Sequence, residues 1–285
     1  EVCVIDFGKL AESFVEVAKN IAHERVSVFL NTKVKAIKKN GQIYEILSNN
    51  GSFKSRAVVV DAGAHSLLMA KSMGYGKEYS VLPVVGSFYY SPAVLKNKVY
   101  TVQTEKLPFT SIHGDPDIHA LGKTRFGPTT RIQPWLEPRS YLTFVDFLKT
   151  FGFRINVFLS IIKILSDRVI GRFIFKNFTY DIPFFGKKLY LREARKIIPT
   201  LQLKDLDYAK GIGGIRPQIV DTKKKKLLMG EVKIVGDNII FNITPSPGAS
   251  MCLKNAETDA KKVVEFFVEE YNLDQKRLDK MLHKL

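Results

Sequence analysis

The residues best suited to chemistry lie in the last third of the chain. Arg216 stands between the glycine-rich run 211–214 and Pro217. A guanidinium, with its donors in a fixed fork, suits a planar anion such as a carboxylate. The strand-like run 238–243 then ends in small residues at 244–250 and opens directly into a helix pattern. Backbone N–H groups at such a helix start can approach a ligand and favour negative charge, although Ser and Pro there also form an ordinary N-cap.

Two other segments carry residues of the same kinds. The small residues 62–64 follow the apolar run 57–60 and precede a helix pattern, so they allow close backbone approach to a ligand or simply a tight strand–helix connection. His65 is expected to pack against its surroundings rather than to catalyse. His113 is expected to end a strand in a Gly/Asp/Pro turn, with Arg125 on the neighbouring strand, where binding residues concentrate. A structural histidine is the alternative for His113.

Composition indicates a globular protein of one large domain or two interleaved ones, since 45% of the 285 residues are hydrophobic and 25% are charged. The formal net charge of +16 favours nucleic acid, an anionic membrane or an acidic substrate as a partner. The dense basic run Lys223–Lys226 is expected at a solvated hairpin tip. Cys3 and Cys252 lie at opposite ends of the chain and suggest no disulfide framework or metal site, so we expect a reducing compartment.

The N-terminal quarter is expected to form a helix followed by a meander. Apolar residues at helical spacing predict a helix over 7–23 after the N-cap Asp6, and 26–29 is expected as a short strand. Asn-Gly turns at 40–41 and 50–51 separate three meander strands. The chain starts without a signal-peptide pattern and is expected to be a piece of a longer protein.

Long strands dominate the middle of the chain. The strands expected at 81–90, 99–103, 109–113 and 124–128, joined by hairpin-type turns, predict an antiparallel sheet in a second domain. The final element is expected to be a helix over 249–270.

The segment 141–178 is predicted to be mostly helical. Its aromatic and aliphatic residues are punctuated by basic ones, so no window of ~18 residues is free of charge and no transmembrane helix is expected. One reading is that one or two amphipathic helices pack on the sheet. The other is a basic amphipathic surface that rests on anionic lipid. The basic residues are Lys149, Arg154, Lys163, Arg168, Arg172 and Lys176.

Several motifs, taken in order, resemble the FAD-dependent oxidoreductases of the D-amino-acid-oxidase type. They are VVVDAGAHS at 58–66, LPFTSIHGDPD at 107–117, GKTRFGP at 122–128, GIGGIRPQIVD at 211–221 and NITPSPGAS at 242–250. Within that superfamily the sequence most resembles the malate:quinone oxidoreductases, through AKGIGGIRPQ, KLLMGE and IIFNITPSPGA. The resemblance covers essentially all 285 residues.

The resemblance implies an α/β fold, α+β overall. A Rossmann-like FAD-binding domain over 1–78 and 205–285 would be interleaved with a substrate domain over 79–204, built on an antiparallel or mixed sheet with helices. The family's N-terminal strand–Gly-x-Gly-x-x-Gly–helix is absent from the sequence. The resemblance therefore implies a C-terminal portion whose FAD-binding domain is incomplete, and it does not imply that this portion alone holds FAD or is active.

Three places contact the cofactor FAD according to the resemblance. They are a meander position at the adenine, a strand–helix turn at the flavin, and a helix start at the pyrimidine edge of the isoalloxazine. A helix N-terminus suits the negative charge that reduced flavin gathers at N1–C2=O. The matching residues are Val34 for the first, Ala62, Gly63 and Ala64 for the second, and Pro247, Gly248, Ala249 and Ser250 for the third.

The substrate residues that the resemblance implies are two arginines and a histidine. Arg216 matches the arginine near the substrate carboxylate, and Arg125 is a candidate for a second carboxylate. His113 matches the strand histidine facing the flavin, and it would take the hydroxyl proton while the C2 hydride passes to flavin N5. His119 is the reserve base.

The implied activity is oxidation of a 2-hydroxy dicarboxylate, L-malate to oxaloacetate, with electrons passed to a membrane quinone as in the tricarboxylic acid cycle. The alternatives are an L-2-hydroxyglutarate dehydrogenase or another FAD-dependent oxidase, such as an amine oxidase. A non-catalytic basic module for membrane or nucleic acid is the alternative from another class. The basic residues are not interleaved with aromatics on a recognisable motif, so nucleic acid is not expected. The resemblance and the charge together place the protein peripherally on the cytoplasmic face of an anionic membrane.

Overall fold

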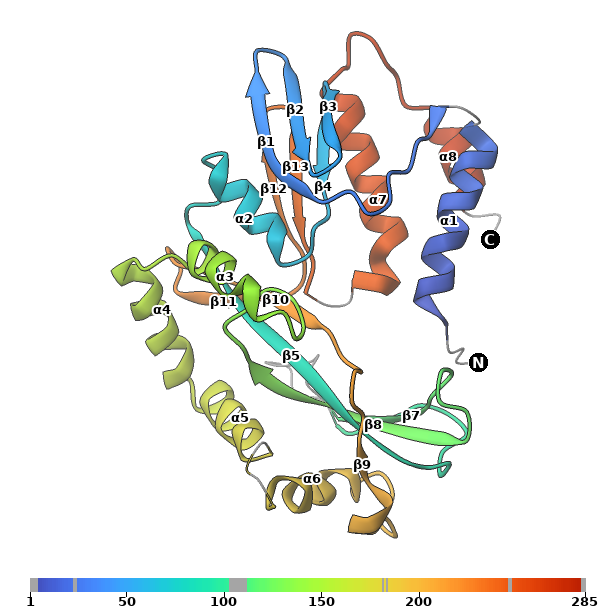
Figure 1. Ribbon diagram of the computed structural model, residues 1–285, viewed down its shortest axis with the longest axis vertical. Helices are drawn as coiled ribbons and strands as arrows, with labels where there is room; N and C mark the ends of the chain where they lie inside the picture. The colour runs from blue at the N-terminus through green and yellow to red at the C-terminus, as the bar shows by residue number, and fades with distance from the viewer. Residues whose placement is uncertain are drawn as a thin grey trace.

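A computed structural model describes residues 5–22, 25–102, 112–180, 182, 184–245 and 248–282. It has a mixed α/β architecture, which confirms the predicted fold class (Figure 1). Two small three-stranded sheets with flanking helices make up one end of the molecule. A larger, mainly antiparallel sheet with the helices of the middle of the chain makes up the other.

The smaller unit combines both ends of the chain. A meander of order β1-β2-β3 lies beside a sheet of order β12-β13-β4, in which β4 pairs with β13 in parallel and β12 pairs with β13 antiparallel. The N-terminal helix prediction is confirmed within the described residues. The elements are α1 (Phe7–Ala22), β1 (Val34–Asn40), β2 (Ile43–Ser48), β3 (Gly51–Ser55), β4 (Val58–Val60), α2 (His65–Ser72), β12 (Val232–Gly236), β13 (Ile239–Ile243), α7 (Gly248–Glu265) and α8 (Gln275–Leu282).

The larger unit is a seven-stranded sheet of order β11-β10-β5-β8-β7-β6, with β9 paired to β5. Figure 1 shows α4, α5 and α6 following one another along this sheet. Its strands are β5 (Tyr79–Pro92), β6 (Val99–Tyr100), β7 (His113–Pro116), β8 (Lys123–Ile132), β9 (Asp207–Tyr208), β10 (Ile215–Asp221) and β11 (Lys226–Leu228), and its helices are the 3-10 turns η3 (Tyr141–Thr143) and η4 (Leu203–Asp205), α3 (Phe144–Phe151), α4 (Ile155–Ser166), α5 (Arg168–Thr179) and α6 (Gly186–Ala194).

The sheets cut across the expected domain boundaries. Strands β9, β10 and β11 belong to the range 205–285, yet they pair within the sheet built mostly from 79–132. The division at 78 and 205 remains a prediction about the complete protein.

Each unit has its own apolar core. Tyr44, Leu67 and Phe241 are fully buried in the smaller unit, and the core of the larger unit contains Phe126 and Tyr190. Burying a large apolar side chain contributes about 1.5–3 kcal/mol, so these residues account for much of the stability that fixes the two units.

Local sequence explains where the predicted helical segment divides. Three helices replace the expected one or two: α3 ends at Gly152, whose φ of +72° suits glycine. Asp167 caps α5 by accepting hydrogen bonds from the backbone N–H groups of Val169 and Ile170.

Two strand predictions are wrong. Residues 26–29 form no strand. His113 begins β7 rather than ending the strand expected at 109–113, of which residues 109–111 lie outside the described residues. Periodicity is a weak signal for runs this short, and strand pairing in the folded protein decides the outcome.

The basic run Lys223–Lys226 does lie at a hairpin tip, where Asp221 accepts hydrogen bonds from the N–H groups of Lys223 and Lys224.

Candidate active site

A cavity of about 550 Å³ lies between the meander and β4. Val34 and Ala62, which the sequence placed at opposite ends of a dinucleotide, both line this cavity. Val34 starts β1, and Ala62 follows β4 at the end of the parallel pair with β13. The remaining lining residues are partly apolar and partly titratable, the latter being Lys33, Asp61, His65 and Glu137. An apolar wall with convergent polar groups is typical of a ligand site.

The turn after β4 brings its backbone to this cavity. Ser66 Oγ accepts a hydrogen bond of 2.8 Å from the Ala62 N–H, and the His65 N–H donates to the Ala62 carbonyl at 3.0 Å. Gly63 has a φ of +55°, and no atom lies within 4 Å of where its Cβ would be. Ala64 is buried against the core. The turn is therefore tight and stabilised by its own hydrogen bonds, while the space around Gly63 is open.

The middle of helix α7 is anchored to the sheet of β12, β13 and β4. Asn242 on β13 and Lys233 on β12 both bind Asp259, which is buried on α7. This clamp fixes the direction of α7, whose first residues Gly248, Ala249 and Ser250 are helical. Their N–H groups lie at the positive end of the helix dipole. Pro247 lies outside the described residues.

Arg216 is located on β10, between β11 and β5 of the larger sheet. It pairs with Val84 of β5, and its side chain is largely buried. Burial lowers the pKa of Arg216 from its ordinary value, because desolvation disfavours the charged form. An arginine remains charged in proteins, so a partly desolvated guanidinium at this position is suited to an anion.

The glycines before Arg216 have a steric role. Gly213 has a φ of +117°, and a Cβ there would lie 2.0 Å from the Gly86 carbonyl oxygen. Only glycine permits this approach of the loop to β5. The glycine run therefore seats the strand that carries Arg216, rather than forming a phosphate cradle.

His113 begins β7 and packs between two aromatic rings. Its ring centroid lies 5.1 Å from that of Tyr100 and 6.3 Å from that of Phe88. Its Nε2 lies 3.7 Å from Oδ1 of Asp115, a residue that is 3% exposed. That oxygen is buried and has no hydrogen-bond partner among the described residues. A buried carboxylate beside an imidazole can orient the ring and stabilise its protonated form.

Arg125 joins the same cluster. It binds Asp115 Oδ2 at 2.8 Å and Asp117 Oδ2 at 3.4 Å, and its guanidinium lies 5.0 Å from the centroid of the Phe88 ring. Two carboxylates therefore already share its charge. This arrangement supports a role in holding Asp115 more than the predicted role of binding a second substrate carboxylate.

Arg216 and His113 lie on one face of the larger sheet. Arg216 pairs with Val84, and Phe88, whose ring neighbours that of His113, lies four residues farther along β5 on the same face. Two strands, β5 and β8, separate β10 from β7, and the spacing along β5 is roughly 13 Å. The fold brings the two side chains to a common surface but not into contact, and neither lines the cavities described here.

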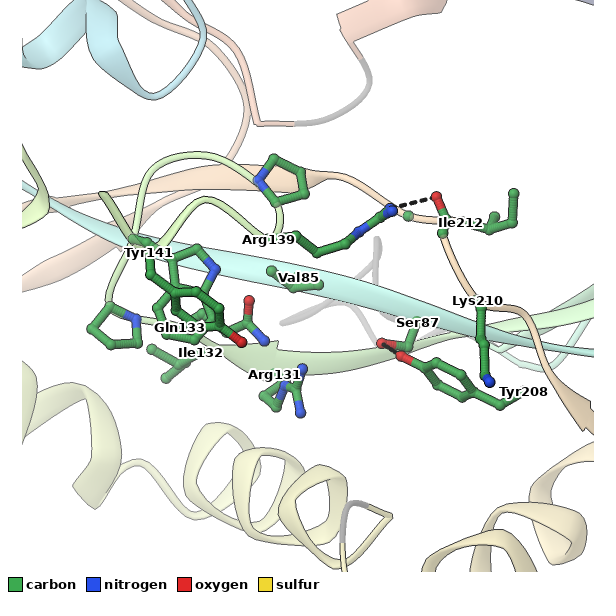
Figure 2. A pocket seen from close by; sticks show the side chains of 15 residues that line it. Val85, Ser87, Arg131, Ile132, Gln133, Arg139, Tyr141, Tyr208, Lys210 and Ile212 are labelled. Carbon is green, nitrogen blue, oxygen red and sulfur yellow. Dashed lines mark hydrogen bonds between the residues drawn. The ribbon is translucent and has the colours of Figure 1, made fainter. Parts of the chain in front are cut away.

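A second cavity, of about 520 Å³, lies on the opposite face, where Val85 and Ser87 alternate with the residues facing Arg216 (Figure 2). In Figure 2, Arg139 reaches the Gly211 carbonyl, and the Tyr208 hydroxyl meets Ser87 Oγ at 3.2 Å. None of the predicted site residues lines this cavity.

The structure also adds to and removes from the list of candidates. Asp115 was missed, although the sequence signal was present as a carboxylate two residues after His113, the spacing that puts both side chains on one face of a strand. The reserve base His119 is 65% exposed and lies 3.9 Å from Asp6. An imidazole this exposed does not have the desolvated surroundings of a buried base.

Solved structures define the class of fold. No family model matches the chain. A glycerol-3-phosphate dehydrogenase from Bacillus halodurans, solved in complex with FAD, aligns with 90% of this chain and 42% of its own, with a TM-score of 0.52 at 14% identity. The chain therefore shares part of the fold of an FAD-containing oxidoreductase.

Sequence similarity points to one group within that class. The malate:quinone oxidoreductases of Helicobacter pylori strains J99 and 26695 are 43% identical to this chain over 275 residues. A probable malate:quinone oxidoreductase of Campylobacter jejuni is 42% identical over 275 residues. Each alignment covers 95% of this chain and 61% of the relative. The resemblance seen in the motifs is confirmed, and the chain spans about three-fifths of the length of these relatives.

Proposed function

We propose that the complete protein containing this chain oxidises L-malate to oxaloacetate, uses FAD, and passes the electrons to a membrane quinone. The chain would be the C-terminal portion of that enzyme. The observation that carries the proposal is the 43% identity over 275 residues to proteins named malate:quinone oxidoreductase. The partial fold match to an FAD-containing dehydrogenase supports the same class.

The residues present fit FAD. Val34 and Ala62 line one cavity, so the position matched to the adenine contact and the turn matched to the flavin contact would border the same space. The uncrowded turn at Gly63 and the start of α7 at Gly248 would offer backbone N–H groups to the cofactor. When bound, the flavin supplies the acceptor for the two electrons and the hydrogen removed from the substrate carbon.

The chain's own side chains would bind the substrate and move its proton. Arg216 would hold a malate carboxylate through a bidentate pair, strengthened by its burial. His113, whose Nε2 lies 3.7 Å from Oδ1 of Asp115, would take the proton of the substrate hydroxyl. Asp115 would fix the ring, and Arg125 would fix Asp115.

The helices α3–α5 would form the membrane surface. In α4, Val157, Ser160 and Ile164 are buried, while Leu159 and Ile162 are among the exposed apolar side chains. The six basic residues of the segment stand beside these apolar ones, the combination that favours an anionic bilayer surface. Within the part of the chain that the structure describes, no helix is long and apolar enough to cross a bilayer. We place the contact on the cytoplasmic membrane face.

The substrate assignment is tested with Arg216→Ala and Arg216→Lys in the full-length protein. The alanine variant is expected to raise the KM for malate on the order of 10²-fold, because a desolvated charge pair is lost. The lysine variant should recover part of that loss, since it restores charge without the planar fork. If both variants keep the KM of the parent protein, another group holds the carboxylate.

The membrane surface is tested separately by flotation with vesicles. A Leu159→Asp, Ile162→Asp double variant of the full-length protein should no longer float with vesicles rich in anionic lipid. Unchanged flotation would place the membrane contact elsewhere.

A further inference from the structure

Gln218 is a buried amide that has no hydrogen-bond partner within the part of the chain that the structure describes. It lies in the middle of β10, is 2% exposed, and neither its Nε2 nor its Oε1 has a hydrogen-bond partner among the described residues. Buried side-chain amides in folded proteins are normally satisfied. An amide with both of its groups unsatisfied therefore indicates a missing polar ligand, either water or a larger molecule.

Gln218 lines an apolar groove. It shares the groove with aliphatic residues of β5 and β8, including Val84, and residues of α4 and α5, including Ile164, Phe173 and Phe178. The groove therefore suits a ligand that is apolar over most of its surface and carries oxygen atoms at one end. Water would satisfy the amide but would meet hydrocarbon on most other sides.

The location of the groove further limits the kind of ligand that could enter it. Its outer wall is made of α4 and α5, whose opposite faces expose the apolar side chains of the proposed membrane surface. Gln218 also follows Arg216 by two residues, so both side chains leave the same face of β10, about 7 Å apart. A ligand in the groove would thus come from the bilayer side and end near the substrate arginine.

We propose that this groove binds the ring of the quinone acceptor, with Gln218 as its polar contact. The Nε2 amide donates a hydrogen bond to a quinone carbonyl, and Oε1 accepts one from the corresponding quinol hydroxyl. A glutamine amide can thus match both redox forms of the ligand. The inference rests on the proposed function only for the identity of the acceptor.

The groove must widen to take a ring. Its unfilled space is about 50 Å³, compared with the ~150 Å³ cavity that admits benzene in an engineered core. Phe173 and Phe178 line it from α5, and Phe178 is 52% exposed. Rotation of these side chains would open the groove toward the bilayer without moving the sheet.

The test measures binding of a short-chain ubiquinone and of 2,3-dimethyl-1,4-naphthoquinone to the full-length holoenzyme, by calorimetry without malate. Gln218→Leu is expected to raise both dissociation constants about tenfold, the loss of one buried hydrogen bond. Gln133→Leu is the matched control, since Gln133 is a buried glutamine that lines the cavity on the opposite face, and it should change neither constant more than twofold.

A second variant keeps the test independent of the amide. Ile174→Trp places a larger side chain in the groove from α5 and should also raise both constants at least tenfold. The groove assignment is overturned if the parent protein binds neither quinone, if Gln218→Leu binds as tightly as the parent, or if Gln133→Leu weakens binding equally. Amide-dependent quinone binding in a protein that malate does not reduce would support the groove while rejecting malate as the substrate.

Discussion

The cofactor cavity and the proposed substrate residues Arg216 and His113 differ in how the fold positions them. The cavity joins Val34 and Ala62 through backbone geometry at a strand start and a strand–helix turn. The substrate residues are side chains from separate strands, with Arg216 on β10 and His113 on β7. The first kind of site is built mostly within residues 33–69, with Glu137 added from farther along the chain. The second kind also needs the strand register and the ligand itself to bring its groups together.

The largest predicted effect that tests this difference between the two sites is the loss of kcat on substitution of His113. His113→Gln in the full-length protein should lower kcat for malate about 10²–10⁴-fold, the range for loss of a general base, while FAD binding stays unchanged. His119→Gln is the matched control and should retain activity within twofold, since that side chain is 65% exposed. The reverse pattern in steady-state kinetics would move the base to His119.

The next effect concerns the carboxylate that the sequence interpretation missed. Asp115→Asn should lower kcat on the order of tenfold and leave the KM for malate nearly unchanged, because it disturbs the orientation of His113 rather than substrate binding. Asp115→Glu should rescue part of the loss. Asp117→Asn is the control, because Asp117 also binds Arg125, at 3.4 Å, whereas it is the Asp115 carboxylate that lies 3.7 Å from His113 Nε2. Equal losses of kcat in Asp115→Asn and Asp117→Asn would show that the cluster acts only in stability.

The cofactor cavity should respond differently. Val34→Gln places an amide among aliphatic walls, which costs about 1–3 kcal/mol when unpaired, so the dissociation constant for FAD should rise about tenfold. Turnover with malate at saturating FAD should stay within twofold. Lys35 is the exposed neighbour of Val34. Lys35→Gln should therefore alter neither the dissociation constant for FAD nor the turnover with malate. Fluorescence titration of the apoprotein distinguishes the outcomes, and a loss of turnover without a loss of affinity would contradict the assignment.

The smallest predicted effect is a pH dependence of the free energy of unfolding, and it tests the contact between the two units. Lys71 on α2 donates a hydrogen bond of 2.6 Å to the Thr150 carbonyl on α3, and burial lowers the pKa of Lys71 to about 8. The unfolded chain therefore holds more protons between pH 8 and 10.5, so this lysine makes the free energy of unfolding rise with pH in that window. Relative to Lys71→Met, the parent protein should gain about 1 kcal/mol from pH 8 to 10.5, after allowance for partial solvent exposure. Urea titrations at both pH values measure this, and a flat difference would show that Lys71 is not buried on folding.

The same contrast explains how far the sequence could be interpreted. The meander, the long strands β5 and β8 and the helix α7 follow from turn residues and periodicity, which act locally. The strand expected at 26–29 failed because a short apolar run does not determine its partner. The salt bridges of Arg125 and the separation of Arg216 from His113 depend on strand order and on the register shift between Ser87 and Tyr89. No pattern within one segment contains that information.

Anaerobic titration of the full-length, FAD-loaded protein with L-malate tests the central claim most directly. We predict that malate removes the absorption band of oxidised flavin in a stoichiometric reaction, and that L-2-hydroxyglutarate and amines do so at least a hundredfold more slowly, a discrimination that site complementarity can supply. Retention of the oxidised band with malate, or faster loss with 2-hydroxyglutarate or an amine, would contradict the assignment.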